Sequence, residues 1–160
     1  HNWNSFLTAP LPISSLYLGK LTQAVRVTIL GNLWIFFLFF VCGKAAGIQG
    51  PFPKEAPEWF LCGTVGAVVV CCVQLLLSLL IRSFAVPIGI ALAGGILGLY
   101  MTNHDYGMNY PYSIYCLGMR ANNPNMEIST LTLIVNSIGY IAIFAALSVF
   151  YLRKHEISAN

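Results

Sequence analysis

Residues 60–101 form one nearly uninterrupted apolar stretch, and this stretch constrains the fold more than any other part of the chain. Its one charged side chain is Arg82, close to the middle. A single helix of that length would measure about 60 Å, roughly twice the ~30 Å hydrocarbon core of a bilayer. Because the stretch is apolar all round, it does not look like the amphipathic helix of a soluble protein. It therefore predicts two membrane-spanning helices with a turn at Arg82 and Ser83.

The composition extends this prediction to the whole chain. Of the 160 residues, 58% are hydrophobic and 8% are charged, and the mean hydropathy is +0.75. Soluble domains carry about 25% charged residues, so this chain has too few charges to cover a surface in water. The net charge of +3 is spread thinly without a basic run, which disfavours nucleic-acid binding. We expect an all-α, polytopic transmembrane helix bundle.

The apolar segments divide the chain into spans and connections. Four spans are predicted within a transmembrane bundle of residues 25–152, at about 25–46, 60–81, 84–102 and 128–152. Because the chain begins with His1 rather than Met, we expect it to be an excerpt of a longer protein. Four is then the lowest span count of the parent protein.

The segments outside the spans differ in character. Residues 1–24 carry apolar side chains at helical spacing around a proline break, which predicts a cytoplasmic interfacial helix, an elbow and a helix leading into the bilayer. Residues 102–127 are rich in Asn and Tyr, which predicts a polar loop with its tyrosines at the membrane interface. Residues 153–160 are expected to form a cytoplasmic tail.

The distribution of Lys and Arg predicts the orientation. If the Arg82 turn is cytoplasmic, alternation of the spans places more of these side chains inside than outside. The inner group is Lys20, Arg26, Arg82, Arg153 and Lys154, and the outer group is Lys44, Lys54 and Arg120. Both ends of this chain are then expected in the cytoplasm.

The polar and small residues within the predicted spans indicate helix packing more than a substrate or transport site. Thr28 and Asn32 are expected to make interhelical hydrogen bonds. Small residues on the third span predict close-packing faces, although they could instead mark an unwound span around a substrate; these residues are Ala91, Gly94, Gly95 and Gly98.

Several classes of activity are disfavoured. No Asp, Glu or His lies within a predicted span, which disfavours intramembrane hydrolases and ion-coupled transporters. No phosphate-binding loop occurs, so the chain is not expected to bind ATP itself. The pair His104-Asp105 is a weak metal motif, and no catalytic residue, metal or cofactor is expected in this chain. A disulfide is possible among Cys42, Cys62 and Cys116, but free thiols are favoured. The bundle suits lipid-like or amphipathic cargo, or a purely structural role.

The N-terminal segment resembles the one that follows the second span of type-2 ABC exporter permeases, where a Trp or Leu pair precedes a proline elbow into the third span. The matching residues are Trp3, Leu7, Pro10, Ser14, Tyr17 and Lys20. Together with Phe6, they form the segment that is expected to couple the chain to an ATPase. The glycine-rich 87–98 and the later sequence Tyr110-Pro111-Tyr112-Ser113 resemble, more narrowly, the lantibiotic- and bacitracin-protection permeases of Gram-positive bacteria.

The resemblance implies that this chain covers spans three to six of a permease in a bacterial plasma membrane. It implies a separate cytosolic ATPase that docks on the N-terminal segment, a second permease subunit, and an antimicrobial peptide as cargo, in immunity or antibiotic resistance. ATP would then be bound by the partner subunit. Two alternatives from other classes remain: a membrane scaffold or sensor subunit that transports nothing, and a secondary carrier of small amphiphiles.

Overall fold

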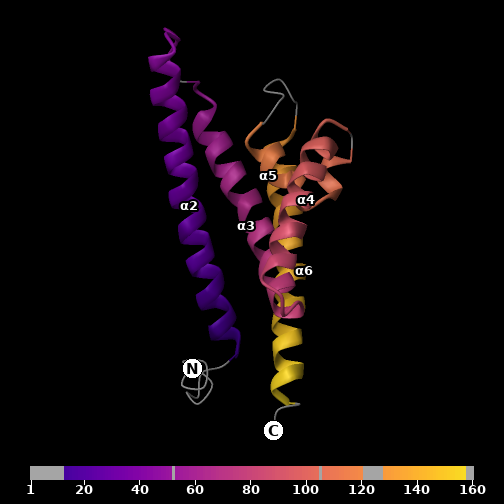
Figure 1. Ribbon diagram of the computed structural model, residues 1–160. Coiled ribbons are helices and arrows are strands. Elements are labelled where there is room, and N and C mark those ends of the chain that lie inside the picture. The colour runs from indigo at the N-terminus through magenta and orange to yellow at the C-terminus, as the bar shows by residue number, and fades with distance from the viewer. Residues whose placement is uncertain (1–12, 52, 105, 121–127, 158–160) are drawn as a thin grey trace.

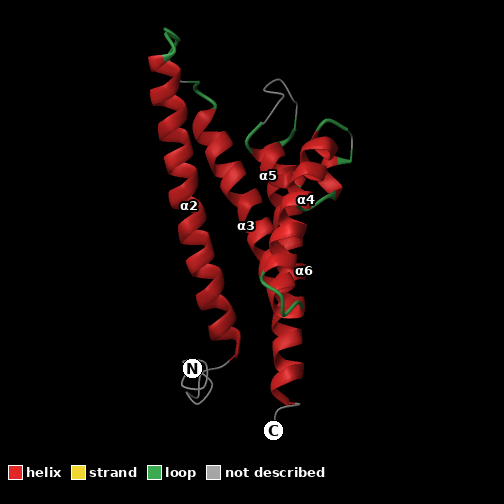
Figure 2. Ribbon diagram, in the orientation of Figure 1, coloured by secondary structure: helices red, strands yellow, loops and turns green. Residues whose placement is uncertain are grey.

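The fold is a bundle of long helices (Figure 1). The computed structural model describes residues 13–51, 53–104, 106–120 and 128–157, and within these ranges it has helices and loops but no strand (Figure 2). Six elements follow in chain order: α2 (Ile13–Ala45), α3 (Ala56–Leu80), α4 (Ala85–Thr102), the 3-10 turn η1 (Gly107–Asn109), α5 (Ser113–Gly118) and α6 (Thr130–Ile157). Helices α2, α3, α4 and α6 are each long and apolar enough to cross a membrane. The predicted all-α polytopic bundle is confirmed.

The turn predicted at Arg82 is confirmed. Helix α3 ends at Leu80 and α4 begins at Ala85, and Arg82 is exposed between them. Ile81 has an extended backbone (φ −111°, ψ 117°), which ends α3. Pro87 lies in the first turn of α4, where the absence of its N–H costs no helical hydrogen bond. We call this the Arg82 end of the bundle, and the opposite end the α5 end.

Helix α2 runs without a break from Ile13 through the predicted first span. Its 33 residues measure about 50 Å, more than a ~30 Å hydrocarbon core requires. It packs along α3 and more loosely on α6. In the most apolar part of α2, 6% of the residues are buried, against 33% in α3. Helix α3 is therefore the centre of the bundle, whereas α2 leaves most of its surface uncovered (Figure 1).

The loop predicted for residues 102–127 is wrong in its middle part. Helix α5 lies inside the bundle against α3 and α4, near the end where α4 finishes (Figure 1). Ser113 and Ile114 are fully buried, and Leu117 is nearly so. The physical reason is that the buried residues form one face of a six-residue helix. An apolar face so short cannot be recognised by periodicity when polar residues surround it in the sequence.

Glycines allow the backbone of α5 to pack directly against the backbones of its neighbouring helices. A Cβ atom on Gly66 would lie 2.8 Å from the backbone oxygen of Ile114, and one on Gly118 would lie 2.6 Å from the backbone of Cys62. On α4, a Cβ atom on Gly98 would lie 3.0 Å from the backbone of Tyr112. Small residues permit this close packing within membranes. Any side chain at these positions would push α5 outward.

This packing predicts the effect of adding one methyl group. Gly66→Ala should lower stability by about 1–3 kcal/mol, the typical cost of overpacking, because the new Cβ meets backbone atoms that cannot rotate away. Gly95→Ala is the matched control, since nothing lies within 4 Å of its Cβ position. It should be neutral or slightly stabilising through its better helix propensity. Thermal unfolding of the purified protein in detergent measures both. Equal melting temperatures for the two variants would contradict the proposed contact.

Candidate functional site

Polar side chains from three helices meet inside the bundle. Asn32 of α2 is 4% exposed, and its Nδ2 donates a hydrogen bond to Oγ1 of Thr64 on α3 at 3.2 Å. The hydroxyl of Tyr115 on α5 donates to Oδ1 of the same Asn32, also at 3.2 Å. A buried amide without partners would be costly, and here both ends of the amide are bonded. We call these three residues the Asn32 junction.

A second set of polar contacts ties α3 to the start of α5. Gln74 Nε2 donates to the hydroxyl of Tyr112 at 2.7 Å, and the ring of Tyr112 covers Gly94 of α4. The hydroxyl of Thr28 lies 3.4 Å from Sγ of Cys71, which links α2 to α3. The interhelical hydrogen bonds predicted for Thr28 and Asn32 are thus confirmed. Tyr112 and Tyr115, two of the tyrosines expected at the membrane interface, are hydrogen-bond partners of Gln74 and Asn32.

The two tyrosines act as neutral groups. Burial raises the pKa of Tyr112 and of Tyr115 above that of an exposed phenol. For Tyr112, the neighbouring Tyr110 adds to the increase and the bond from Gln74 opposes it. Both phenols therefore keep their protons at neutral pH. Both tyrosines therefore contact Gln74 and Asn32 through hydrogen bonds and as uncharged side chains.

Further polar contacts hold the α5 end of the bundle together. Asn136 of α6 donates to the backbone oxygen of Met108 at 2.5 Å, and the Thr130 hydroxyl donates to the carboxylate of Glu58. Arg120 has a positive φ of 51°, and its Nη2 donates to the backbone oxygen of Ile128 at 2.9 Å. The connection between α4 and α6 is therefore bonded to α6, and the start of α6 is bonded to α3.

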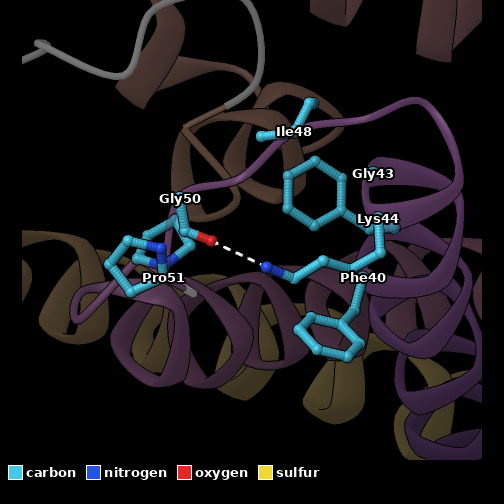
Figure 3. A pocket seen from close by; sticks show the side chains of 8 residues that line it. Phe40, Gly43, Lys44, Ile48, Gly50 and Pro51 are labelled. Atoms are coloured by element: carbon cyan, nitrogen blue, oxygen red, sulfur yellow. Dashed lines mark hydrogen bonds between the residues drawn. The ribbon is translucent and has the colours of Figure 1, made fainter.

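Two surface hollows lie at opposite ends of the molecule. At the α5 end, a pocket of about 160 Å³ lies beside the last turn of α2. There Lys44 Nζ donates to the backbone oxygen of Gly50 at 2.9 Å and lies 5.9 Å from the centroid of the Phe40 ring (Figure 3). At the Arg82 end, a cavity of about 460 Å³ lies between α2, α3 and α4.

The residues predicted to couple the chain to an ATPase are only partly described. Those outside the described residues are Trp3, Phe6, Leu7 and Pro10. In the first turns of α2, Ser14 is half-buried and Lys20 is exposed. Tyr17 is 2% exposed, with its hydroxyl beside Ser148 of α6 and Cys72 of α3. Tyr17 therefore faces the bundle and anchors the start of α2.

The small residues predicted as a packing face lie on two sides of α4. Gly94 and Gly98 are buried against Tyr112. Gly95 has no atom within 4 Å of its Cβ position, and Ala91 is half-buried. The inner face of α4 thus meets the connection to α5. Sequence reasoning missed this contact and the matching small residues of α3, although the spacing of Cys62 and Gly66 is a signal for it.

The described residues hold no metal-binding cluster. No group of three or more His, Cys, Asp or Glu side chains converges among them. His104 Nδ1 lies 3.0 Å from the backbone oxygen of Tyr100, while Asp105 falls outside the described part of the chain. The chain's cysteines are free thiols.

Comparison with known protein families decides the class. Residues 1–98 match the family described as ABC-2 family transporter protein. The chain belongs to this family. It is accordingly a multi-pass membrane protein and a permease component of an ABC transporter, so the broader part of the resemblance seen at residues 1–20 is confirmed. The matched region includes α2, α3 and most of α4. Comparisons with curated proteins and with solved structures found no match.

The Asn32 junction of this ABC-2 permease predicts a measurable coupling. Tyr115→Phe should cost about 1 kcal/mol of stability, because Oδ1 of Asn32 loses its donor. In an Asn32→Leu background the same change should cost little, and the coupling energy should be about 0.6 kcal/mol or more. Reversible unfolding in detergent gives the four free energies of the cycle. Tyr106→Phe is the control, since Tyr106 is 67% exposed. Additive effects would show that the two residues do not interact.

Proposed function

We propose that this chain is the membrane-spanning part of an ATP-driven exporter that expels antimicrobial peptides or other amphiphiles from a bacterial plasma membrane. A separate cytosolic ATPase supplies the energy by docking on residues 1–20. A second permease subunit, either a copy of this protein or a different one, completes the pathway. Both ends of the chain and the Arg82 turn are then cytoplasmic.

The observation that carries this proposal is the continuity of α2. The helix begins at Ile13, within the proposed docking segment of residues 1–20, and it continues to Ala45 without a break. A continuous helix moves as one body, so a displacement at its start is not absorbed by a bend. Tyr17 passes such a displacement to α3 and α6, against which it is buried.

The same helix reaches the opposite half of the bundle. Its Asn32 is bonded to Tyr115, which belongs to α5 at the α5 end. A movement of α2 would therefore change the hydrogen bonds that hold α5 in place. In the proposed cycle, ATP-driven movement of residues 1–20 shifts α2, and the shift loosens α5 at the outer end of the pathway.

The surfaces of the bundle suit an amphipathic cargo. Helix α2 exposes large apolar side chains, among them Leu30, Trp34 and Phe39. These side chains can face lipid, or apolar parts of a cargo that enters sideways from the bilayer. The polar groups described in the helical interior are bonded to one another, so the polar parts of a peptide would have to replace these hydrogen bonds.

Co-purification tests the coupling. The double variant Trp3→Ala, Leu7→Ala should lose association with the proposed ATPase subunit by at least about tenfold, which corresponds to roughly 1.4 kcal/mol. Its melting temperature should stay unchanged, because the spans are not altered. Trp34→Ala removes an exposed tryptophan from the middle of α2 and should keep the complex.

The outcome separates the alternatives. An intact complex in the double variant would contradict docking at residues 1–20, and absence of any ATPase from the wild-type complex would favour a scaffold. Transport that stops when a proton or sodium gradient is collapsed, and not when ATP is removed, would identify a secondary carrier.

A further inference from the structure

The cavity at the Arg82 end has walls from three helices. Ala24 of α2 lies on one side, Leu75 of α3 forms part of the back, and Pro87 and Ile88 belong to α4. Its volume of about 460 Å³ is in the range of pockets that hold a small organic ligand. The walls are mainly apolar, so the few polar groups that line the cavity decide which ligand it can hold.

Gln74 is a polar side chain deep in this cavity. It precedes the last residue of α3, Leu80, by about 9 Å along the helix axis. Helix α3 is about 37 Å long, little more than a ~30 Å hydrocarbon core. Gln74 therefore lies within the hydrocarbon region, where lipid rather than water surrounds the helices and offers its amide no hydrogen bond.

One end of the Gln74 amide is bonded and the other is open. Its Nε2 donates to the hydroxyl of Tyr112 at 2.7 Å, whereas no described residue donates to its Oε1. The described side-chain atoms that are fully enclosed without a partner are the Tyr17 hydroxyl and Nη1 of Arg120, so Oε1 of Gln74 is not sealed off by protein. A ligand with an N–H or O–H group would remove the cost of this unbonded oxygen.

The mouth of the cavity presents an aromatic ring. Phe84, the residue before α4, lines the cavity and is 85% exposed. Within the described part of the chain, it packs on no other aromatic ring. Aromatic rings attract one another beyond what their apolar area provides. A planar ring that enters the cavity can therefore pack on Phe84, with Leu75 and Ile88 as its apolar surroundings.

We propose that this cavity binds the indole ring of an amphipathic ligand. The indole N–H donates to Oε1 of Gln74, and the ring packs against Phe84. An indole has one donor and no acceptor, so it bonds the open oxygen without bringing an unbonded acceptor of its own into the hydrocarbon. A purely aliphatic ligand would leave Oε1 without a donor. The binding itself requires no ATPase; only the identity of the ligand, a tryptophan-containing cargo, rests on the proposed export function.

Two ring compounds of nearly equal size test the hydrogen bond. Benzofuran has the bicyclic shape of indole, but an oxygen replaces the N–H, so it cannot donate. The rise in melting temperature of the purified protein with ligand concentration gives each affinity, after correction for partition into detergent. Indole should bind about fivefold more tightly than benzofuran, the effect of one neutral hydrogen bond. Equal affinities would overturn the proposal.

Two variants show whether Gln74 is the acceptor. Gln74→Leu removes Oε1 and keeps an apolar side chain, so indole and benzofuran should then bind equally. This change also breaks the bond to Tyr112, and Tyr112→Phe breaks the same bond while keeping Oε1. Tyr112→Phe should therefore retain the fivefold preference for indole. Loss of the preference in both variants, or in neither, would contradict a hydrogen bond from the ligand to Gln74.

Filling the cavity tests where the ring lies. Ala24→Phe places a ring inside the cavity and keeps Gln74, so both compounds should lose binding. Gly95→Ala lies outside the lining and should bind both as the wild type does. Wild-type affinity in an Ala24→Phe variant that melts at the wild-type temperature would place the ligand elsewhere. Because the assay contains no ATPase, a negative result leaves the export proposal untouched.

Discussion

The backbone contact between α3 and α5 is the constraint on which the rest of the bundle depends. Gly66 lets α5 approach α3 so closely that no side chain fits between them. Gly118 makes the reciprocal approach from α5, against the backbone of Cys62. Dispersion contacts and backbone proximity replace the hydrophobic driving force, which is weak between helices in lipid. Because α5 is fixed on α3, the ends of α4 and α6 are held beside it.

The hydrogen bonds of the interior follow from this placement. Once α5 is inside the bundle, Tyr112 and Tyr115 point at α3 and α2, where their hydroxyls pair with the side-chain amides of Gln74 and Asn32. These bonds are specific because a polar group in an apolar interior has few alternative partners. They also give α2, which otherwise packs loosely, a defined contact with α5. The contact between α2 and α5 is thus made by polar side chains, although the side chains around it are apolar.

The two ends of the bundle suit different tasks. The α5 end is closed by hydrogen bonds and tight glycine packing, whereas the Arg82 end has an open cavity that Arg82 lines. In an ABC-2 permease, α2 joins the proposed ATPase-docking residues to both regions.

The sequence by itself determined the membrane class, the spans and the turn at Arg82, because continuous apolarity and one interrupting charge are local properties. It also indicated the ABC-2 family through residues 1–20, and Asn32 as an interhelical donor. Only the tertiary structure decided that residues 113–118 lie inside the bundle, that Tyr115 is the partner of Asn32, and that Gly66 marks the contact. These features depend on pairs of residues far apart in the chain, and a six-residue buried face is too short for any periodic pattern to show.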